Sequence, residues 1–232
     1  MLYNIDLKWF KLKKGAKILD IGSALGVNSI GLKESGYKLT ALEIDPKLVA
    51  QFKKNEATKD IPIFNGDATK MSFKDNSFDG AVLIEVIEHV PDTKSLLSEI
   101  NRVLKKGGQL CIGVPTGYTD KVYQSLHKDY PRNTTHVHVF KKQQSVGKLE
   151  QAGFEVKKIQ TKNFPPAVSW FFHSLLRSKS DHTGKIHNHL FIDKILDPLF
   201  ATWSKIPVLK RGLSFTEKHF GKSWYIYCEK VA

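Results

Sequence analysis

Cysteine and long apolar runs are both scarce in this sequence. The only two cysteines, Cys111 and Cys228, lie far apart in apolar runs typical of strands, so we interpret them as buried hydrophobic residues and not as a disulfide or metal pair. No apolar run approaches the roughly 20 residues of a membrane-spanning helix. The first 15 residues also lack the apolar core and cleavage site of a signal peptide. We therefore expect a soluble cytoplasmic protein.

Acidic residues are also few relative to basic ones. The chain has 36 lysines and arginines against 23 acids, which gives a formal net charge of +13. A basic surface attracts nucleic acid, anionic lipid head groups or acidic small molecules, and charge alone does not choose among them. No dense run of lysine and arginine occurs, so a solvated lysine-rich surface is an equal alternative. Contact with an anionic membrane surface is one expectation, and nucleic acid is a weaker one.

The most informative stretch is KILDIGSALG, residues 17–26. Residues 17–21 are a short apolar run typical of a buried parallel strand, and the glycines at 22 and 26 frame a turn before a helix. At such a turn a ligand can approach the backbone, and the first unpaired N–H groups of the helix face it. About twenty residues on, a second apolar run ends in Glu43, where a carboxylate can accept hydrogen bonds from both ribose hydroxyls. The pattern predicts a nucleotide-like cofactor.

The charge and the glycine spacing distinguish between cofactors. A dinucleotide site usually has G-x-G-x-x-G, whereas here Ala24 stands between Gly22 and Gly26. Asp20 is a poor neighbour for a pyrophosphate and suits a cofactor with an ammonium and a sulfonium. The stretch resembles the first motif, D-x-G-x-G-x-G, of the class I S-adenosylmethionine-dependent methyltransferases. It departs from that motif at Ala24, whose methyl group could narrow the methionine pocket.

Two later segments extend this resemblance, which is to the small-molecule methyltransferases similar to those of ubiquinone and menaquinone. Family members commonly bind the adenine amine with an acid after the third strand, where Asp67 lies, although Asp67 alone would be interpreted as a turn residue. Residues 71–88 resemble the family's fourth-strand region, which brings Glu85, Glu88 and His89 to the carboxyl edge of the sheet. The expected cofactor contacts are Asp20, Gly22, Ser23, Gly26, Glu43, Ile44, Gly66, Asp67, Ala68 and Glu85.

Histidines supply the candidates for a catalytic base. His136 and His138 would point to the same side of an extended segment, which suits a catalytic pair, a metal pair or two polar residues at a pocket rim. Because no acidic or cysteine companion lies at ligand spacing, we expect no metal. In many methyltransferases of this type a histidine placed like His136 faces the acceptor. The expected catalytic residues are His136, His138 and His89, for an acceptor that needs a base.

The resemblance implies a Rossmann-like α/β fold with three layers and a seven-stranded, mostly parallel sheet whose last strand is antiparallel. We expect one domain over residues 1–232, with its core at about 15–160 and 222–232 and a helical insert at about 163–221. The expected strands are residues 17–21, 38–44, 61–64, 78–84, 109–114, 154–160 and 223–230, and the expected helices are residues 2–14, 27–35, 47–57, 92–104 and 141–152.

The insert bears on the methyl acceptor. Its apolar spacing predicts two amphipathic helices rich in aromatic residues, the second interrupted by Pro198. They could cover the sheet, form a lid over the acceptor, or meet a membrane or another subunit. An aromatic lid would make the acceptor site apolar. The sequence therefore predicts methyl transfer from S-adenosylmethionine to a small, hydrophobic or lipid-like acceptor.

Three alternatives remain open. A nicotinamide-dependent oxidoreductase is disfavoured by Asp20 and by the missing glycine. A nucleic-acid methyltransferase is favoured by the basic charge, but residues 84–89 lack the Asn/Asp-Pro-Pro-aromatic run of base-amine methyltransferases. A non-catalytic module that binds the cofactor and docks on a membrane or partner is the third. The sequence does not indicate the acceptor atom or the oligomeric state.

Overall fold

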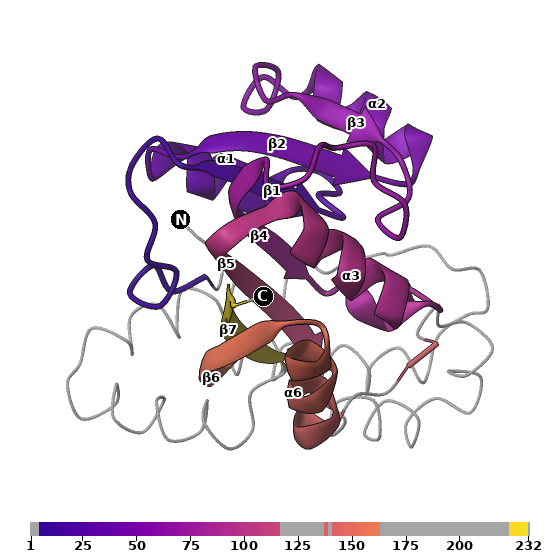
Figure 1. Ribbon diagram of the computed structural model, residues 1–232. Helices are drawn as coiled ribbons and strands as arrows, with labels where there is room; N and C mark the ends of the chain where they lie inside the picture. Colours follow the sequence, from indigo (N-terminus) through magenta and orange to yellow (C-terminus); the bar gives the residue numbers. More distant parts are fainter. Residues whose placement is uncertain (1–4, 117–136, 139–140, 163–222, 232) are drawn as a thin grey trace, which may run out of the picture.

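The computed structural model describes residues 5–116, 137–138, 141–162 and 223–231. These residues form a seven-stranded sheet in the order β3-β2-β1-β4-β5-β7-β6 (Figure 1). All neighbouring strands are parallel except β7, which runs antiparallel to both β5 and β6. This arrangement confirms the predicted fold class. The strands are β1 (Lys17–Ile21), β2 (Lys38–Glu43), β3 (Ile63–Asn65), β4 (Phe78–Ile84), β5 (Leu104–Pro115), β6 (Phe154–Lys162) and β7 (Ser223–Lys230), and the helices are α1 (Val27–Glu34), α2 (Pro46–Lys54), η1 (Ile87–His89, a 3₁₀ turn), α3 (Thr93–Val103) and α6 (Lys142–Gln151).

The expected helix over residues 2–14 is wrong for its described part. Residues 7–10 form turns, in which the N–H of Trp9 donates to the carbonyl of Asp6 over 2.9 Å. The Asp6 N–H in turn donates to the hydroxyl of Tyr227 at 2.8 Å, and Phe10 is buried. The apolar residues of this segment thus pack against the sheet without forming a helix. The Asp6 N–H donates to Tyr227 of β7 and not to a carbonyl one helical turn earlier.

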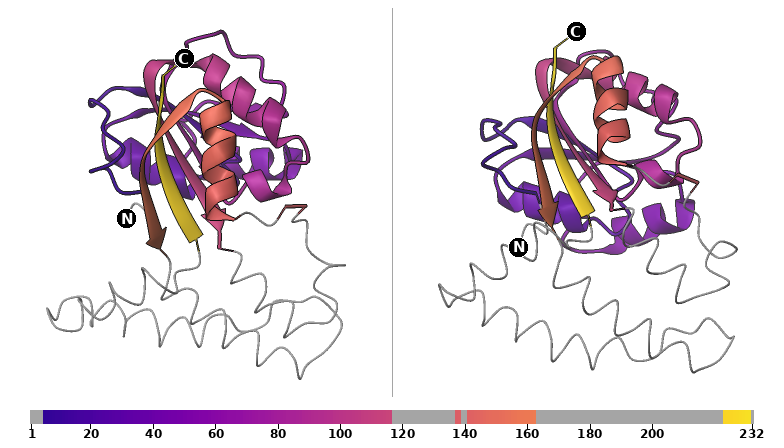
Figure 2. Two further views of the ribbon diagram at one scale, coloured as in Figure 1. Left: turned by 60° about the horizontal axis from the view of Figure 1, so that its bottom comes forward. Right: turned by 90° about the horizontal axis from the view of Figure 1, so that it is seen from below.

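Helices cover both faces of the sheet, which confirms the three-layer architecture. One core cluster contains the apolar faces of α3 and α6, with Leu96, Leu97, Ile100 and Leu149 buried. The other contains residues of α1, α2 and the N-terminal segment, among them Leu32, Phe52 and Phe10. The two further views in Figure 2 show α3 and α6 together on one side of the sheet. Burial of such apolar side chains from water stabilises both layers.

Three of the strands begin or end at the carboxyl edge of the parallel strands, next to segments that lie outside the described residues. Pro115 at the end of β5 and Lys162 at the end of β6 both pair with Ser223 at the start of β7. The expected insert at 163–221, including its two helices, lies outside the described residues. Within the described residues, no helix has the length and apolar character needed to cross a membrane.

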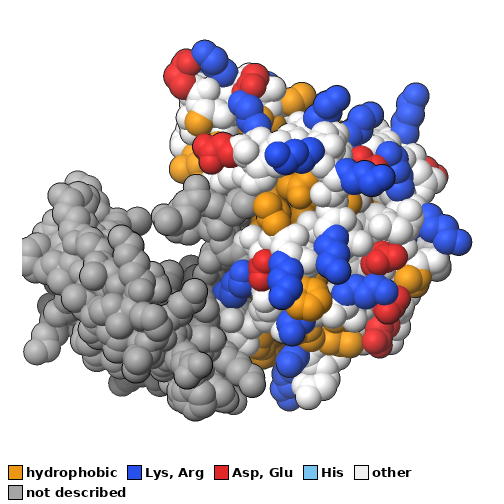
Figure 3. Space-filling view, turned by 90° about the vertical axis from the view of Figure 1, so that its left-hand side faces the viewer, with side chains coloured by type: hydrophobic (Ala, Val, Ile, Leu, Met, Phe, Trp, Pro, Cys, Tyr) orange, Lys and Arg blue, Asp and Glu red, His pale blue; other side chains and the backbone are white. Residues whose placement is uncertain are grey.

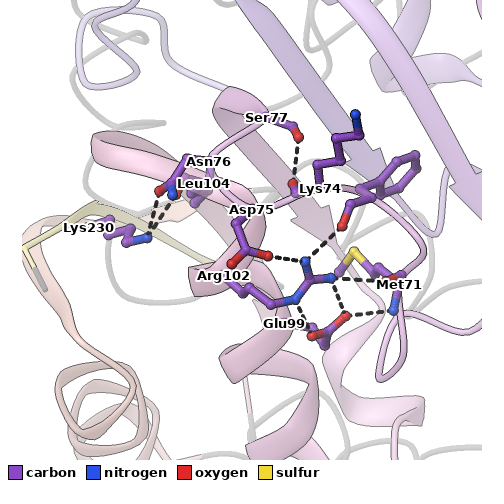
Figure 4. A network of polar contacts seen from close by, with 10 residues as sticks. Met71, Lys74, Asp75, Asn76, Ser77, Glu99, Arg102, Leu104 and Lys230 are labelled. Atoms are coloured by element: carbon purple, nitrogen blue, oxygen red, sulfur yellow. Dashed lines mark hydrogen bonds and ion pairs between the residues drawn. The ribbon is translucent and has the colours of Figure 1, made fainter.

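A network centred on Arg102 secures the loop between β3 and β4 (Figure 4). The guanidinium donates to Glu99 Oε1 and Asp75 Oδ1, each at 2.6 Å, and to the carbonyls of Phe73 and Met71 at 2.7 and 2.9 Å. The hydrogen bond from Arg102 lowers the pKa of Glu99. The network connects the loop to α3, and the charge of Arg102 is paired with those of Glu99 and Asp75.

Candidate active site

The turn between β1 and α1 requires glycine at its two ends. Gly22 and Gly26 have φ angles of +68° and +84°. A Cβ atom on Gly22 would lie 2.4 Å from Val86 Cγ2, and one on Gly26 would lie 2.6 Å from Thr58 Cγ2. Both positions are therefore restricted by backbone conformation and by space. The close approach of Val86 also places the end of β4 against this turn.

Glu43 at the end of β2 is bonded directly to the turn. The side chain is 6% exposed, its Oε2 accepts from the Ala24 N–H at 2.9 Å, and its Oε1 accepts from the Asp45 N–H at 3.0 Å. The Gly22 N–H donates to the carbonyl of Leu42 at 2.8 Å. A carboxylate has about four acceptor positions, so two remain for the hydroxyls of a ligand.

Asp20 adds a second buried carboxylate beside Glu43. It is 1% exposed, and its Oδ2 accepts a 2.5 Å hydrogen bond from Ser29 Oγ. Burial raises the pKa of Asp20 to about 6, and the neighbouring charge of Glu43 acts in the same direction. Neither acid takes part in any ion pair found among the described residues. Two buried acids without a cation form an electrostatically negative site that favours a cationic group.

Ser23 lies inside the same turn with an unused polar group. Its side chain is buried, at 5% exposed. Its Oγ has no hydrogen-bond partner within the part of the chain that the structure describes. Buried hydroxyl groups normally have such a partner, so this atom is suited to a ligand at the turn.

The end of β3 orients the residues after Glu43. Asn65 Nδ2 donates to the carbonyls of Glu43 and Ile44, both at 2.9 Å, and the Gly66 N–H donates to the Glu43 carbonyl at 3.0 Å. Ile44 is 66% exposed, the largest exposed fraction among the exposed large hydrophobic residues of the described part of the chain. An exposed apolar side chain beside a carboxylate could cover the face of a flat, apolar ring.

Asp67 follows Gly66 and is exposed. Its Oδ1 accepts from both the N–H and the Oγ1 hydroxyl of Thr69, each at 2.8 Å, which is the geometry of an Asx turn. Ala68 is partly buried against the core cluster beneath α3. The structure therefore places both residues at the predicted edge, with one oxygen of Asp67 engaged in the turn.

The end of β4 brings together three of the polar residues singled out in the sequence, Glu85, Glu88 and His89. Glu85, partly buried, has a φ angle of +56°, and its N–H donates to the Gly113 carbonyl at 3.0 Å. Glu88 is buried, with His89 Nε2 3.9 Å from its Oε1, and its carbonyl accepts from the N–H of His138 at 3.3 Å. The structure thus brings His89 and His138 to the same segment. His138 Nε2 lies 3.1 Å from the carbonyl of Pro91, and the predicted catalytic residue His136 lies outside the described residues.

A separate groove of about 620 Å³ lies between α3 and α6. Its lining includes Thr93, Lys94 and Lys148 and none of the predicted site residues. Lys148 Nζ donates to Thr93 Oγ1 at 2.8 Å across this groove. The groove is therefore distinct from the carboxyl edge that holds Asp20 and Glu43.

Sequence reasoning missed four residues that shape the site. Ser29 bonds Asp20, Asn65 bonds the backbone after β2, and Val86 and Thr58 pack where a Cβ on Gly22 or Gly26 would lie. Ser29 and Asn65 could have been suspected as polar residues in the first helix after the turn and in a turn after a strand. The contacts of Val86 and Thr58 join elements distant in sequence, so no local pattern indicates them.

The chain is similar in sequence to known methyltransferases. Residues 19–112 match the family described as "Methyltransferase domain". The chain is 29% identical over 51% of its length to the demethylmenaquinone methyltransferase of Corynebacterium efficiens, and 31% identical over 62% of its length to the sterol 24-C-methyltransferase ERG6B of Gibberella zeae. These matches cover 50% and 41% of the relatives, so the chain spans half or less of their length.

Solved structures show the same fold at low sequence identity. A SAM-dependent methyltransferase from Methanosarcina mazei has a TM-score of 0.63 at 18% identity, with 98% of each chain covered. The phosphoethanolamine N-methyltransferase 2 of Haemonchus contortus, solved with S-adenosylhomocysteine, has a TM-score of 0.58 at 19% identity over 97% of this chain and 50% of the other.

Proposed function

We propose that this chain is a class I S-adenosylmethionine-dependent methyltransferase and that it transfers the methyl group of that cofactor to a small, hydrophobic or lipid-like molecule. The observation that carries the proposal is the glycine turn with two buried acids, Asp20 and Glu43, and no cation paired with either among the described residues. A dinucleotide pyrophosphate would be repelled there, whereas an ammonium and a sulfonium would be attracted.

We assign the residues at this edge to the parts of the cofactor as follows. Glu43 would accept from the ribose hydroxyls, and Asp20 would attract the methionine ammonium. Ser23 Oγ and the backbone of the turn would contact the methionine portion. Ile44 would cover the adenine ring, and Asp67, Gly66 and Ala68 would lie along its edge, with Glu85 near the end of β4. The bound cofactor supplies a methyl group that its sulfonium already makes reactive.

The protein's own contribution is alignment, exclusion of water and, for some acceptors, removal of a proton. An acceptor nucleophile must lie in line with the methyl group, which converts a bimolecular step into an effectively unimolecular one. A hydroxyl or acidic carbon also needs a base, for which we propose His89, His138 or His136. An amine acceptor would need little more than positioning.

The acceptor class is supported by the relatives. The two curated relatives reported above are named for a quinone precursor and for a sterol, which are both lipids. The phosphoethanolamine enzyme is named for a polar acceptor, so a small polar amine is the alternative within the same chemistry. For a lipid acceptor we also propose peripheral contact with anionic membranes. Figure 3 shows lysine and arginine side chains spread over one face of the described residues, consistent with the net charge of +13.

The test begins with calorimetric titration of S-adenosylmethionine, S-adenosylhomocysteine and a nicotinamide dinucleotide, repeated on Glu43→Ala. We expect S-adenosylmethionine and S-adenosylhomocysteine to bind the wild type, and the nicotinamide dinucleotide not to bind. Binding of the dinucleotide alone would contradict the proposal and favour an oxidoreductase.

The second step measures transfer of a radiolabelled methyl group to three substrate panels: quinols and sterols in vesicles, small amines, and RNA. We expect product only with the lipid panel. Transfer to RNA would establish the nucleic-acid alternative, and cofactor binding without transfer to any panel would favour a non-catalytic module.

A further inference from the structure

Ala24 occupies a backbone conformation that usually requires glycine. Its φ angle is +46°, and only Asn76 and Glu85 share a positive φ among the other described residues that are not glycine. Alanine is disfavoured there because its Cβ approaches the backbone. A residue persists in such a conformation only when the surrounding structure holds it.

One contact that holds it comes from β2, in addition to the turn hydrogen bond from the Gly26 N–H to the Ser23 carbonyl at 2.8 Å. The Ala24 N–H donates to Glu43 Oε2, and this is the only hydrogen bond between the backbone of residues 22–26 and a side chain within the described part of the chain. The carboxylate is itself oriented, because it is buried and its other oxygen accepts from the Asp45 N–H. Glu43 therefore constrains the centre of the turn through a hydrogen bond within the chain.

We propose that Glu43 is a positioning residue for the turn, in addition to the ribose contact assigned above, and that this role exists because residue 24 is alanine. A glycine at position 24 would adopt the left-handed conformation without such a constraint. The importance of Glu43 to the cofactor-free protein should therefore depend on the residue at position 24.

A double-mutant cycle on the cofactor-free protein tests this dependence. The four proteins are wild type, Glu43→Ala, Ala24→Gly and the double variant, and the readout is Tm. The effects of losing the Glu43 charge beside Asp20 and of the space left behind occur in both backgrounds and cancel in the cycle. We expect Glu43→Ala to lower Tm by about 2–4 °C less when residue 24 is glycine.

Controls and an independent readout make the cycle decisive. Glu150→Ala changes an exposed glutamate on α6 and should lower Tm equally in both backgrounds. Equal losses for Glu43→Ala would overturn the proposal. If the alanine variant does not fold, Glu43→Gln replaces it, and amide hydrogen exchange of the wild type adds a measurement without mutation. The Ala24 N–H should exchange slowly, and rapid exchange would also contradict the proposal.

The consequence for ligand binding rests on the proposed function. Ala24→Gly should restore part of the S-adenosylhomocysteine affinity that Glu43→Ala or Glu43→Gln removes, because the turn then keeps its shape without the carboxylate. Failure of the wild type to bind this ligand would refute the proposed function and leave the Tm cycle interpretable. Normal binding by the wild type with no such restoration would contradict the positioning role.

Discussion

The glycine turn after β1 and the Arg102 network beside α3 differ in whether their charged side chains have ion-pair partners among the described residues. Arg102 donates to two carboxylates and two backbone carbonyls, so its charge and those of Glu99 and Asp75 are paired within the chain. Asp20 and Glu43 are more deeply buried, and the ion pairs of the described residues do not include them. Such burial is costly unless a partner is supplied.

The difference indicates what each region is for. The Arg102 network connects a loop without helix to the helical layer, and Arg102 is paired with both Glu99 and Asp75 within the chain (Figure 4). The turn instead combines two carboxylates that have hydrogen bonds but no ion-pair partner among the described residues with an alanine at positive φ, which are features expected where a ligand completes the structure. Variants in the Arg102 network should therefore change stability alone, whereas variants in the turn should also change cofactor binding.

The largest effect is expected at Gly22, where a substitution should reduce both stability and cofactor binding. Gly22→Ala places a Cβ 2.4 Å from Val86 Cγ2 at a φ of +68°, and should lower the free energy of unfolding by about 2–5 kcal/mol and abolish S-adenosylhomocysteine binding. Urea unfolding measures the free energy of unfolding, and calorimetry measures S-adenosylhomocysteine binding. The control is Gly147→Ala, since no atom lies within 4 Å of its added Cβ. Normal binding by the Gly22 variant would show that the turn does not contact the ligand.

Arg102→Met should affect stability alone. It leaves Glu99 and the carbonyls of Met71 and Phe73 without their donor, which should cost about 2–3 kcal/mol of unfolding free energy. Cofactor affinity, measured by calorimetry below the unfolding temperature, should be unchanged. The stability of Arg102→Lys should lie between those of the wild type and Arg102→Met, because lysine keeps the charge but not the planar set of donors. Loss of affinity in the methionine variant would mean that the two regions are coupled.

Asp20→Asn should have opposite effects on stability and binding. The pKa of Asp20 rises from 3.8 to about 6 on folding, so the folded state holds the proton more tightly and stability falls as pH rises from about 4 to 6. At pH 7 the asparagine variant should be more stable by up to about 3 kcal/mol, and this gain should disappear below about pH 4. S-adenosylmethionine affinity should decrease. Unfolding measured from pH 4 to pH 7 tests the sign, and a gain that does not depend on pH would contradict the assignment.

Ile44→Ser should produce the smallest change and only in binding. The side chain is 66% exposed, so its loss should leave unfolding unaffected, while removal of an apolar cover over a ring should weaken S-adenosylhomocysteine binding by about 1 kcal/mol. Val231→Ser, at an exposed valine near the end of the chain, is the matched control. Equal calorimetric affinities for wild type and Ile44→Ser would remove Ile44 from the cofactor site.

Much of the fold could be predicted because its signals are local. The apolar runs of β1, β4 and β7 match the observed strands residue for residue, since a buried strand has a continuous apolar sequence bounded by turn residues. Boundaries that depend on competing hydrogen bonds were displaced. The helix expected over 47–57 ends at Lys54 because Asn55 is extended and its Oδ1 accepts from the Ala57 N–H.

The sequence by itself determined the order of the elements, the glycine turn and the acids at the ends of β1 and β2, because each is set by a short run of residue types. Only the tertiary structure decided that Glu43 bonds Ala24, that Ser29 bonds Asp20 and that Val86 fills the space beside Gly22. These contacts join residues from different elements at distances of a few ångströms. They depend on how strands pack side by side, which no periodicity along the chain specifies.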